Sequence, residues 1–147
     1  MSTRDAPLQV VLVDDHPVVR AGLTAVLSAT GDIEVAAEAG SHGEALALLT
    51  GAGGPLGGVA VDVVVVDLHL GSGPDGAALI HDLRGLGVAI PMLVLTAHDD
   101  GDDVLRAVEA GASGYLLKDA PPTSLRDGVA RAAAGEIQAL AVTGVEG

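Results

Sequence analysis

Short apolar segments alternate with amphipathic segments five times along this 147-residue chain. The apolar segments are rich in Val, Leu, Ile and Ala: Leu8–Val13, Ile33–Ala39, Val61–Val66, Met92–Leu95 and Ser113–Leu117. Three of them are apolar runs rather than alternating patterns, as is typical of parallel strands that helices cover on both faces. The pattern therefore predicts five strands that are buried in the middle layer of a fold.

The intervening stretches have the periodicity of amphipathic helices. The first expected helix begins at Pro17, and the second starts with a capping box of Ser41 and Glu44 and runs to about Thr50. The third is capped by Asp75 and runs through Leu83. The fourth is capped by Asp99 or Asp100 and runs through Ala110, and the fifth is capped by Thr123 and runs through Ala134. Alternating strands and helices form βαβ units with right-handed crossovers. The chain is therefore predicted to be an α/β protein with a doubly wound, five-stranded parallel sheet and five helices.

Composition limits the class of protein further. The length fits one domain with a single buried core, and Tyr115 is the only aromatic residue, so aliphatic side chains must fill that core. The absence of cysteine excludes a disulfide scaffold and thiolate zinc sites. The chain begins with polar residues that do not resemble a secretory signal, and no apolar run reaches the about 20 residues that span a bilayer. We therefore expect a soluble, cytoplasmic domain.

The charge balance is strongly acidic. Twenty Asp and Glu residues against seven Lys and Arg residues give a net charge of −13. Nucleic acids and anionic membranes are bound through Lys and Arg, so neither is an expected partner of this segment. Lys118 is the only lysine in the chain, which makes its position informative.

Polar residues follow four of the expected strands. Asp14 and Asp15 follow the first strand, Asp67 the third, Thr96 the fourth and Lys118 the fifth. In open α/β sheets the functional crevice lies beyond the carboxyl ends of the strands, where the strand order reverses. Three carboxylates meeting there require a cation, and all-oxygen ligands favour Mg²⁺. With a hydroxyl and an ammonium group opposite, such a pocket suits a phosphoryl group carried on a carboxylate.

At these positions the sequence resembles the receiver domains of two-component response regulators, in particular the NarL/FixJ (LuxR-type) class. The matching segments are VVLVDDHPVVRAGL (Val10–Leu23), DVVVVDLHL (Asp62–Leu70), LVLTAH (Leu93–His98) and GASGYLLKDAPPTSL (Gly111–Leu125). The resemblance runs from about Leu8 to Ala134. It implies a flavodoxin-like sheet with strand order 2-1-3-4-5.

The resemblance also implies roles for individual residues. Asp67 is expected to be the phosphoacceptor, and Asp14, Asp15, Asp67 and the backbone carbonyl of His69 are expected to hold Mg²⁺. Thr96, Tyr115 and Lys118 are expected to bind the phosphoryl group and to switch. In this scheme Thr96 moves inward, Tyr115 follows it, and the face made by the fourth helix, fifth strand and fifth helix changes.

The partners are likewise implied by the resemblance. A sensor histidine kinase is the expected phosphodonor, and a homodimer is expected on activation, through either the first and fifth helices or the face that includes the fourth helix. Residues 1–134 are expected to be the receiver domain, and 135–147 a tail or a truncated linker. DNA is an expected partner only through a helix-turn-helix domain that is not present in this chain.

Three features leave other functions open. The loop after Asp67 has Leu70 and Gly71 where many receivers have Met-Pro, and it is one residue longer before Pro74, which would suit a phosphorylation-independent pseudo-receiver. An aspartyl phosphatase with Asp67 as nucleophile is a second alternative, which is disfavoured because His69 stands where a second carboxylate is expected. A transition-metal site using His16, His69 and His98 is a third.

Overall fold

The computed structural model describes residues 7–50, 61–71, 73–97 and 101–135. Five strands and five helices alternate along these segments: β1 (Leu8–Val13), α1 (Pro17–Ser28), β2 (Ile33–Ala39), α2 (His42–Thr50), β3 (Val63–Asp67), α3 (Gly76–Gly85), β4 (Met92–Thr96), α4 (Gly101–Ala110), β5 (Gly114–Leu117) and α5 (Pro122–Ala133). The predicted α/β class with five strands and five helices is confirmed.

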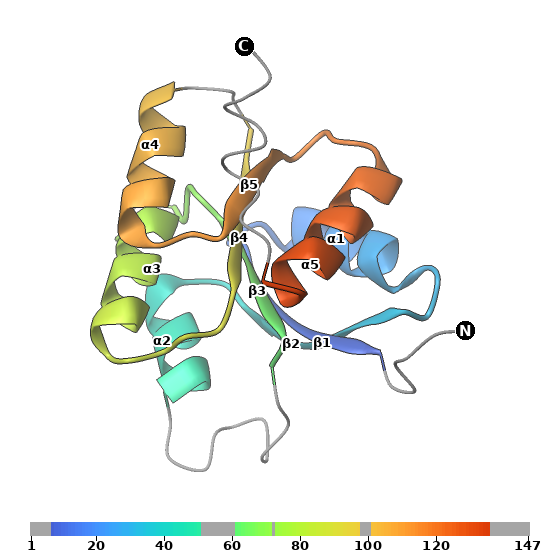
Figure 1. Ribbon diagram of the computed structural model, residues 1–147, viewed down its shortest axis with the longest axis horizontal. Coiled ribbons are helices and arrows are strands. Elements are labelled where there is room, and N and C mark those ends of the chain that lie inside the picture. The colour runs from blue at the N-terminus through green and yellow to red at the C-terminus, as the bar shows by residue number, and fades with distance from the viewer. Residues whose placement is uncertain (1–6, 51–60, 72, 98–100, 136–147) are drawn as a thin grey trace.

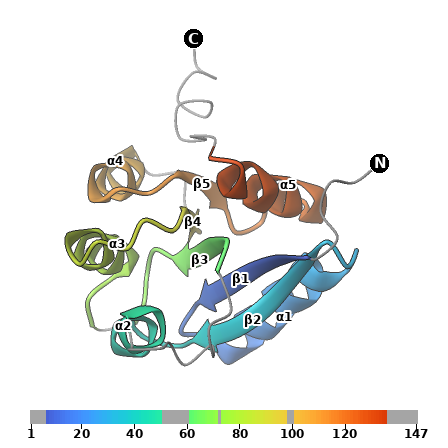
Figure 2. The same cartoon turned by 60° about the horizontal axis from the view of Figure 1, so that its bottom comes forward.

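All neighbouring strands pair in parallel, and their order across the sheet is β2-β1-β3-β4-β5. The predicted order is therefore confirmed. Helices α1 and α5 cover one face of the sheet and α2, α3 and α4 cover the other (Figures 1 and 2). The strand order reverses between β1 and β3, and open α/β sheets place their functional site beyond the carboxyl ends of the strands at such a point.

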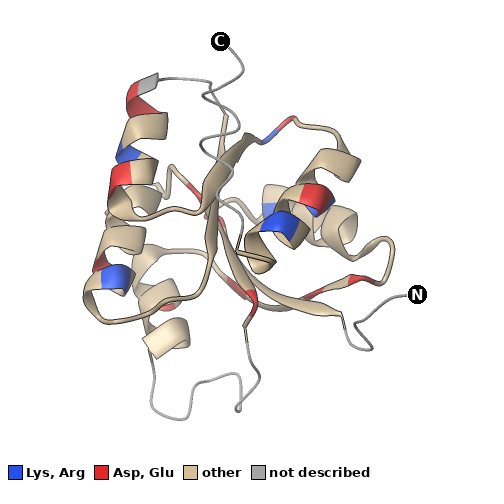
Figure 3. Ribbon diagram, in the orientation of Figure 1, with Lys and Arg blue, Asp and Glu red and all other residues tan. Residues whose placement is uncertain are grey.

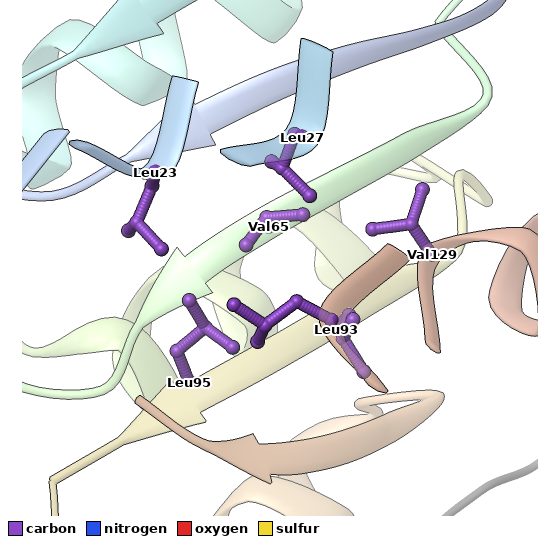
Figure 4. A pocket seen from close by; sticks show the side chains of 7 residues that line it. Leu23, Leu27, Val65, Leu93, Leu95 and Val129 are labelled. Atoms are coloured by element: carbon purple, nitrogen blue, oxygen red, sulfur yellow. The ribbon is translucent and has the colours of Figure 1, made fainter. Parts of the chain in front are cut away.

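Two aliphatic clusters hold the three layers together. One joins the sheet to α2, α3 and α4, and the other joins it to α1 and α5. Within the second cluster, Leu27, Val65 and Leu93 line a void of about 10 Å³ (Figure 4). An apolar void of that size has room for about one water molecule and offers it no hydrogen bonds. It is a packing gap between branched side chains, not a ligand site.

Most element boundaries match the sequence pattern, and the exceptions have physical causes. β3 runs from Val63 to Asp67 rather than from Val61 to Val66, because its pairing with β4 extends to Asp67 itself. The predicted cap of α5 at Thr123 is wrong: the helix begins at Pro122 and its N-cap is Pro121. A proline at the first helical position removes no helical hydrogen bond, because the N–H of any residue at that position has no partner within the helix.

Two predicted caps are present. Asp75 accepts a hydrogen bond from the Ala78 N–H at 2.9 Å and so begins α3. The Ser41 hydroxyl accepts from the Glu44 N–H at 3.1 Å, but Glu44 reaches back to the Gly40 N–H, one residue earlier than a standard capping box. The suggested caps of α4, Asp99 and Asp100, and the loop Gly51–Gly58 lie outside the described residues, as do residues 136–147.

Acidic residues predominate at and near the strand ends, whereas the helices carry acidic and basic residues in similar numbers (Figure 3). Among the described residues, no helix combines the length and the apolarity needed to cross a membrane.

Gly76, the first residue of α3, lies against the backbone of β3. A Cβ atom at this position would be 2.4 Å from the carbonyl oxygen of Asp67 and 3.0 Å from the Cα of Leu68. The Gly76 N–H also donates to the Leu68 carbonyl at 2.7 Å. The helix can pack this closely on the end of β3 only because the residue has no side chain.

We expect Gly76→Ala to lower the free energy of unfolding by about 2 kcal/mol, because backbone must move to make room for the methyl group. Urea unfolding followed by circular dichroism measures this change. Gly22→Ala is the matched control, since a Cβ at this exposed position in α1 meets nothing within 4 Å. It should raise stability by roughly 0.5–1 kcal/mol through helix propensity. Equal effects of the two substitutions would show that the approach at Gly76 is unimportant.

Candidate functional site

Three polar side chains are buried at the carboxyl edge of the sheet. Asp14 immediately follows β1, whereas Asp67 ends β3 and Thr96 ends β4. They are the only buried polar or charged residues among those described, with exposures of 0%, 3% and 1%. Burying carboxylates costs free energy unless cations or hydrogen-bond donors surround them. Their concentration at the switch point therefore marks the functional site.

Lys118, which follows β5, joins the two buried carboxylates. Its Nζ atom donates to Asp67 Oδ2 at 2.8 Å and lies 3.1 Å from Asp14 Oδ2. The Lys118 N–H donates to the Thr96 carbonyl at 2.8 Å, which ties the lysine to the end of β4. The other oxygen of each carboxylate accepts from backbone: Asp14 Oδ1 from the His16 N–H at 2.8 Å, and Asp67 Oδ1 from the His69 N–H at 3.2 Å.

Asp15 completes an acidic cluster that fits a divalent cation. Ligand atoms of Asp14, Asp15, His16 and Asp67 all lie within 4.8 Å of one another. Two carboxylates at that separation repel by about 3 kcal/mol at an effective dielectric of about 20. Asp14 Oδ2 and Asp15 Oδ1 are buried in this cluster; Lys118 Nζ lies 3.1 Å from the first and His16 Nδ1 lies 3.0 Å from the second, so both oxygens already face a nitrogen that can carry positive charge. Carboxylate oxygens are the ligands that Mg²⁺ prefers, and the residues present therefore fit this ion.

The titration of the pocket reflects burial and charge together. Burial raises the pKa of Asp67 above its usual value, and the neighbouring Asp14 adds to this effect, while hydrogen bonding and attraction to Lys118 only partly offset it. Burial lowers the pKa of Lys118, but its contacts with Asp67 and Asp14 outweigh burial, so the net shift is upward. Lys118 is therefore charged at neutral pH and serves as the resident cation of a pocket rich in negative charge.

The loop after β3 closes over Asp15. Gly71 has a left-handed φ of 73°, and a Cβ there would lie 3.0 Å from Asp15 Oδ2. Leu70 is buried in the cluster under α3 and α4. The departure from Met-Pro thus places a buried leucine and a left-handed glycine beside the acidic pair.

The switch residues expected from the resemblance lie on β4 and β5. Thr96 lies at the pocket edge, and Tyr115 pairs with Val94 in the register of the two strands. Tyr115 is 6% exposed and packs into the cluster beneath α3 and α4. A displacement of Thr96 or Tyr115 would therefore change how α4 packs on the sheet.

Of the histidines in the alternative transition-metal site, the described residues place His16, but not His69, in the acidic cluster. The His16 Nδ1 atom lies 3.0 Å from Asp15 Oδ1, at the edge of the acidic cluster. His69 turns instead towards α4, with its Nε2 atom 3.5 Å from Asp103 Oδ2, because the loop carries its side chain outwards. His98 lies outside the described residues.

Sequence reasoning singled out Gly71 as part of an altered loop but missed Gly76, which lets α3 approach the end of β3. The available signal was a glycine directly after the cap Asp75, where a better helix former is expected.

A doubly wound parallel sheet with three aspartates and one lysine gathered at its carboxyl edge defines an α/β domain whose functional site is acidic and fits a divalent cation. The family model described as response regulator receiver domain matches residues 10–130. The chain belongs to this family.

Curated relatives place it near the NarL class. It is 36% identical over 129 residues to the nitrate/nitrite response regulator protein NarP of Escherichia coli, covering 88% of this chain and 56% of that protein. It is 38% identical over 128 residues to the DNA-binding transcriptional activator DevR/DosR of Mycobacterium tuberculosis, covering 87% and 55%. The chain thus spans little more than half the length of these relatives.

Solved structures agree with this assignment. The signal receiver domain of the putative response regulator NarL from Mycobacterium tuberculosis matches with a TM-score of 0.78 and 32% identity, covering 89% of this chain and 99% of that one. The response regulator ChrA of a heme-sensing two-component system matches with a TM-score of 0.70 and 40% identity, covering 90% and 60%.

Lys118→Met should destabilise the metal-free protein by about 2 kcal/mol, since two buried carboxylates lose their shared cation. The value is below that of a fully buried pair because the lysine side chain is 21% exposed. Thermal unfolding in EDTA measures the loss, and added Mg²⁺ should recover part of it.

Arg131→Met is the control for this substitution. It also removes one positive charge, but from an exposed pair with Asp127 on α5. Such pairs contribute little, so its effect should stay within about 0.5 kcal/mol. A Lys118→Met variant no less stable than Arg131→Met would contradict the role of Lys118 as resident cation.

Proposed function

We propose that this chain is a receiver that accepts a phosphoryl group on Asp67 from a sensor histidine kinase and transmits the change through a protein-protein surface. The observation that carries the proposal is the position of Lys118 between Asp67 and Asp14, with Asp15 beside them. A nucleophilic carboxylate, a neighbouring cation and a metal-binding pair are the parts that phosphoryl transfer to an aspartate requires.

In the proposed transfer, a carboxylate oxygen of Asp67 forms a bond to phosphorus as the bond from phosphorus to the donor breaks. The leaving group takes the electron pair of that bond. Lys118, already hydrogen-bonded to Asp67, would bind a phosphoryl oxygen, and the His69 N–H would hold the other carboxylate oxygen. Mg²⁺ held by Asp14, Asp15, Asp67 and the His69 carbonyl would neutralise the charge of the phosphoryl group.

The proposed change of the protein-protein surface begins at residues on the same edge of the sheet. The hydroxyl of Thr96, at the end of β4, would bind a phosphoryl oxygen, and Tyr115 on β5 would then adjust its packing beneath α4. Adding about −1.5 to −2 charges to a carboxylate biases such a two-state element through local hydrogen bonds. The face formed by α4, β5 and α5 is the surface expected to change.

The wider role is also a proposal. Residues 1–134 form the receiver domain, and a helix-turn-helix domain outside this chain would bind DNA, as the name of the activator DevR/DosR indicates for that relative. Activation by homodimerisation, slow hydrolysis of the chain's own phosphoaspartate and a cytoplasmic location belong to the same proposal.

A small-molecule phosphodonor with Mg²⁺ should label wild-type protein once per chain, and Asp67→Asn should abolish the labelling because the nucleophile is lost. Intact-mass spectrometry measures the added phosphoryl group. Asp62→Asn is the matched control: Asp62 lies just before the opposite end of the same strand, where it accepts from the Gln9 N–H at 2.7 Å. It should be labelled normally.

Labelling of Asp67→Asn equal to that of wild type would refute the proposed phosphoacceptor. Wild-type protein that takes up no phosphoryl group and binds no beryllofluoride would support the pseudo-receiver alternative. Sustained turnover of a phosphate ester would support the phosphatase alternative.

A further inference from the structure

Arg20, on α1, contacts the main chain of the Asp14–Asp15 pair rather than their carboxylates. Its Nη1 atom donates to the main-chain carbonyl of Asp14 at 2.6 Å, and its Nε atom donates to Glu38 Oε1 at 2.8 Å. The other oxygen of Glu38 accepts from the Thr24 hydroxyl at 3.2 Å. The guanidinium group is thus held between the end of β2 and the segment that carries Asp14 and Asp15.

The chain leaves space for this guanidinium at Gly40. A Cβ atom there would lie 3.1 Å from Arg20 Nη1, closer than an ordinary contact. Gly40 is itself fixed, because its N–H donates to Glu44 Oε1 at 2.7 Å. The position of Arg20 is therefore defined by α1, by β2 and by the turn that leads into α2.

The contact restrains the peptide unit that joins the two acids. The Asp14 carbonyl and the Asp15 N–H belong to one rigid plane, so a hydrogen bond to that carbonyl sets the direction in which Asp15 leaves the strand. The remaining atoms of Asp14 are also held: its N–H donates to the Ala39 carbonyl at 3.0 Å, and its Oδ1 accepts from His16. Among the described residues, Arg20 is the side chain that donates a hydrogen bond to this peptide.

We propose that Arg20 is a positioning residue for divalent-metal binding: it holds the Asp14–Asp15 peptide so that the Asp15 carboxylate points into the cluster. The inference rests on the proposed function, because it assumes that the acidic pair holds Mg²⁺. Groups that orient metal ligands in this way commonly change metal affinity by about 10–100-fold when they are removed.

Electrostatics alone predicts the opposite sign, which makes the inference testable. A guanidinium group beside the cluster repels a divalent cation, so its removal should tighten Mg²⁺ binding if only charge mattered. Removal of the Glu38 charge should weaken binding on the same grounds. Positioning predicts that loss of Arg20 weakens binding, whereas loss of the Glu38 charge has little effect because the contact with Asp14 survives.

The experiment measures the Kd for Mg²⁺ by isothermal titration calorimetry on the full chain, together with thermal unfolding in EDTA. Arg20→Met should raise the Kd roughly 10-fold. Glu38→Gln is the matched control and should bind Mg²⁺ as wild type does. Arg20→Lys keeps the charge and one donor and should recover part of the affinity.

Gly40→Ala is a second variant, useful if Arg20→Met does not fold. It keeps the charge of Arg20 and crowds only Nη1, so it should weaken Mg²⁺ binding in the same direction but by less. Binding by both variants that is as tight as in wild type, or tighter, overturns the inference. A lower unfolding temperature in EDTA with an unchanged Kd also overturns it, because Arg20 would then stabilise the fold alone.

Failure of the underlying proposal has a different signature. If wild-type protein shows no saturable Mg²⁺ binding, or if Asp15→Asn binds as tightly as wild type, the metal site itself is wrong and the role of Arg20 falls with it. If wild-type protein binds Mg²⁺ and is phosphorylated on Asp67 while Arg20→Met is indistinguishable from it, only the inference about Arg20 fails.

Discussion

The hydrogen bond from Lys118 to Asp67, with Asp14 on the other side of the ammonium group, is the interaction on which this structure depends. It brings together side chains from the ends of β1, β3 and β5. Without the lysine, the two buried carboxylates would repel each other strongly, because the effective dielectric constant inside the protein is low. The single positive charge of Lys118 reduces the repulsion between the carboxylates. The pocket keeps a net negative charge, which favours binding of a divalent cation.

Burial and charge act in opposite directions on the groups of this pocket. Burial raises the pKa of Asp67 while Lys118 opposes that shift, so two competing effects set the protonation of this carboxyl group. The main-chain N–H of Lys118 donates to the Thr96 carbonyl, so the residue that carries the ammonium group is fixed to the end of β4.

The scaffold around the pocket is rigid for reasons of packing. With no large aromatic residue apart from Tyr115, branched aliphatic side chains fill both faces of the sheet, and between α1, α5 and the sheet they leave a void of about 10 Å³. α3 approaches β3 so closely at Gly76 that a single methyl group would collide with the Asp67 carbonyl. The strand that carries Asp67 is thus fixed through its backbone as well as through its side chains.

The sequence by itself determined the fold class, the strand order through the family resemblance, and the strand-end residues that meet at the pocket. These follow from short-range patterns, since the carboxyl ends of parallel strands must share one edge of the sheet. It could not determine that His69 turns towards Asp103 or that Arg20 reaches the Asp14 carbonyl. Those contacts join segments whose separation in space depends on how helices pack on the sheet, and no local pattern of residues encodes that packing.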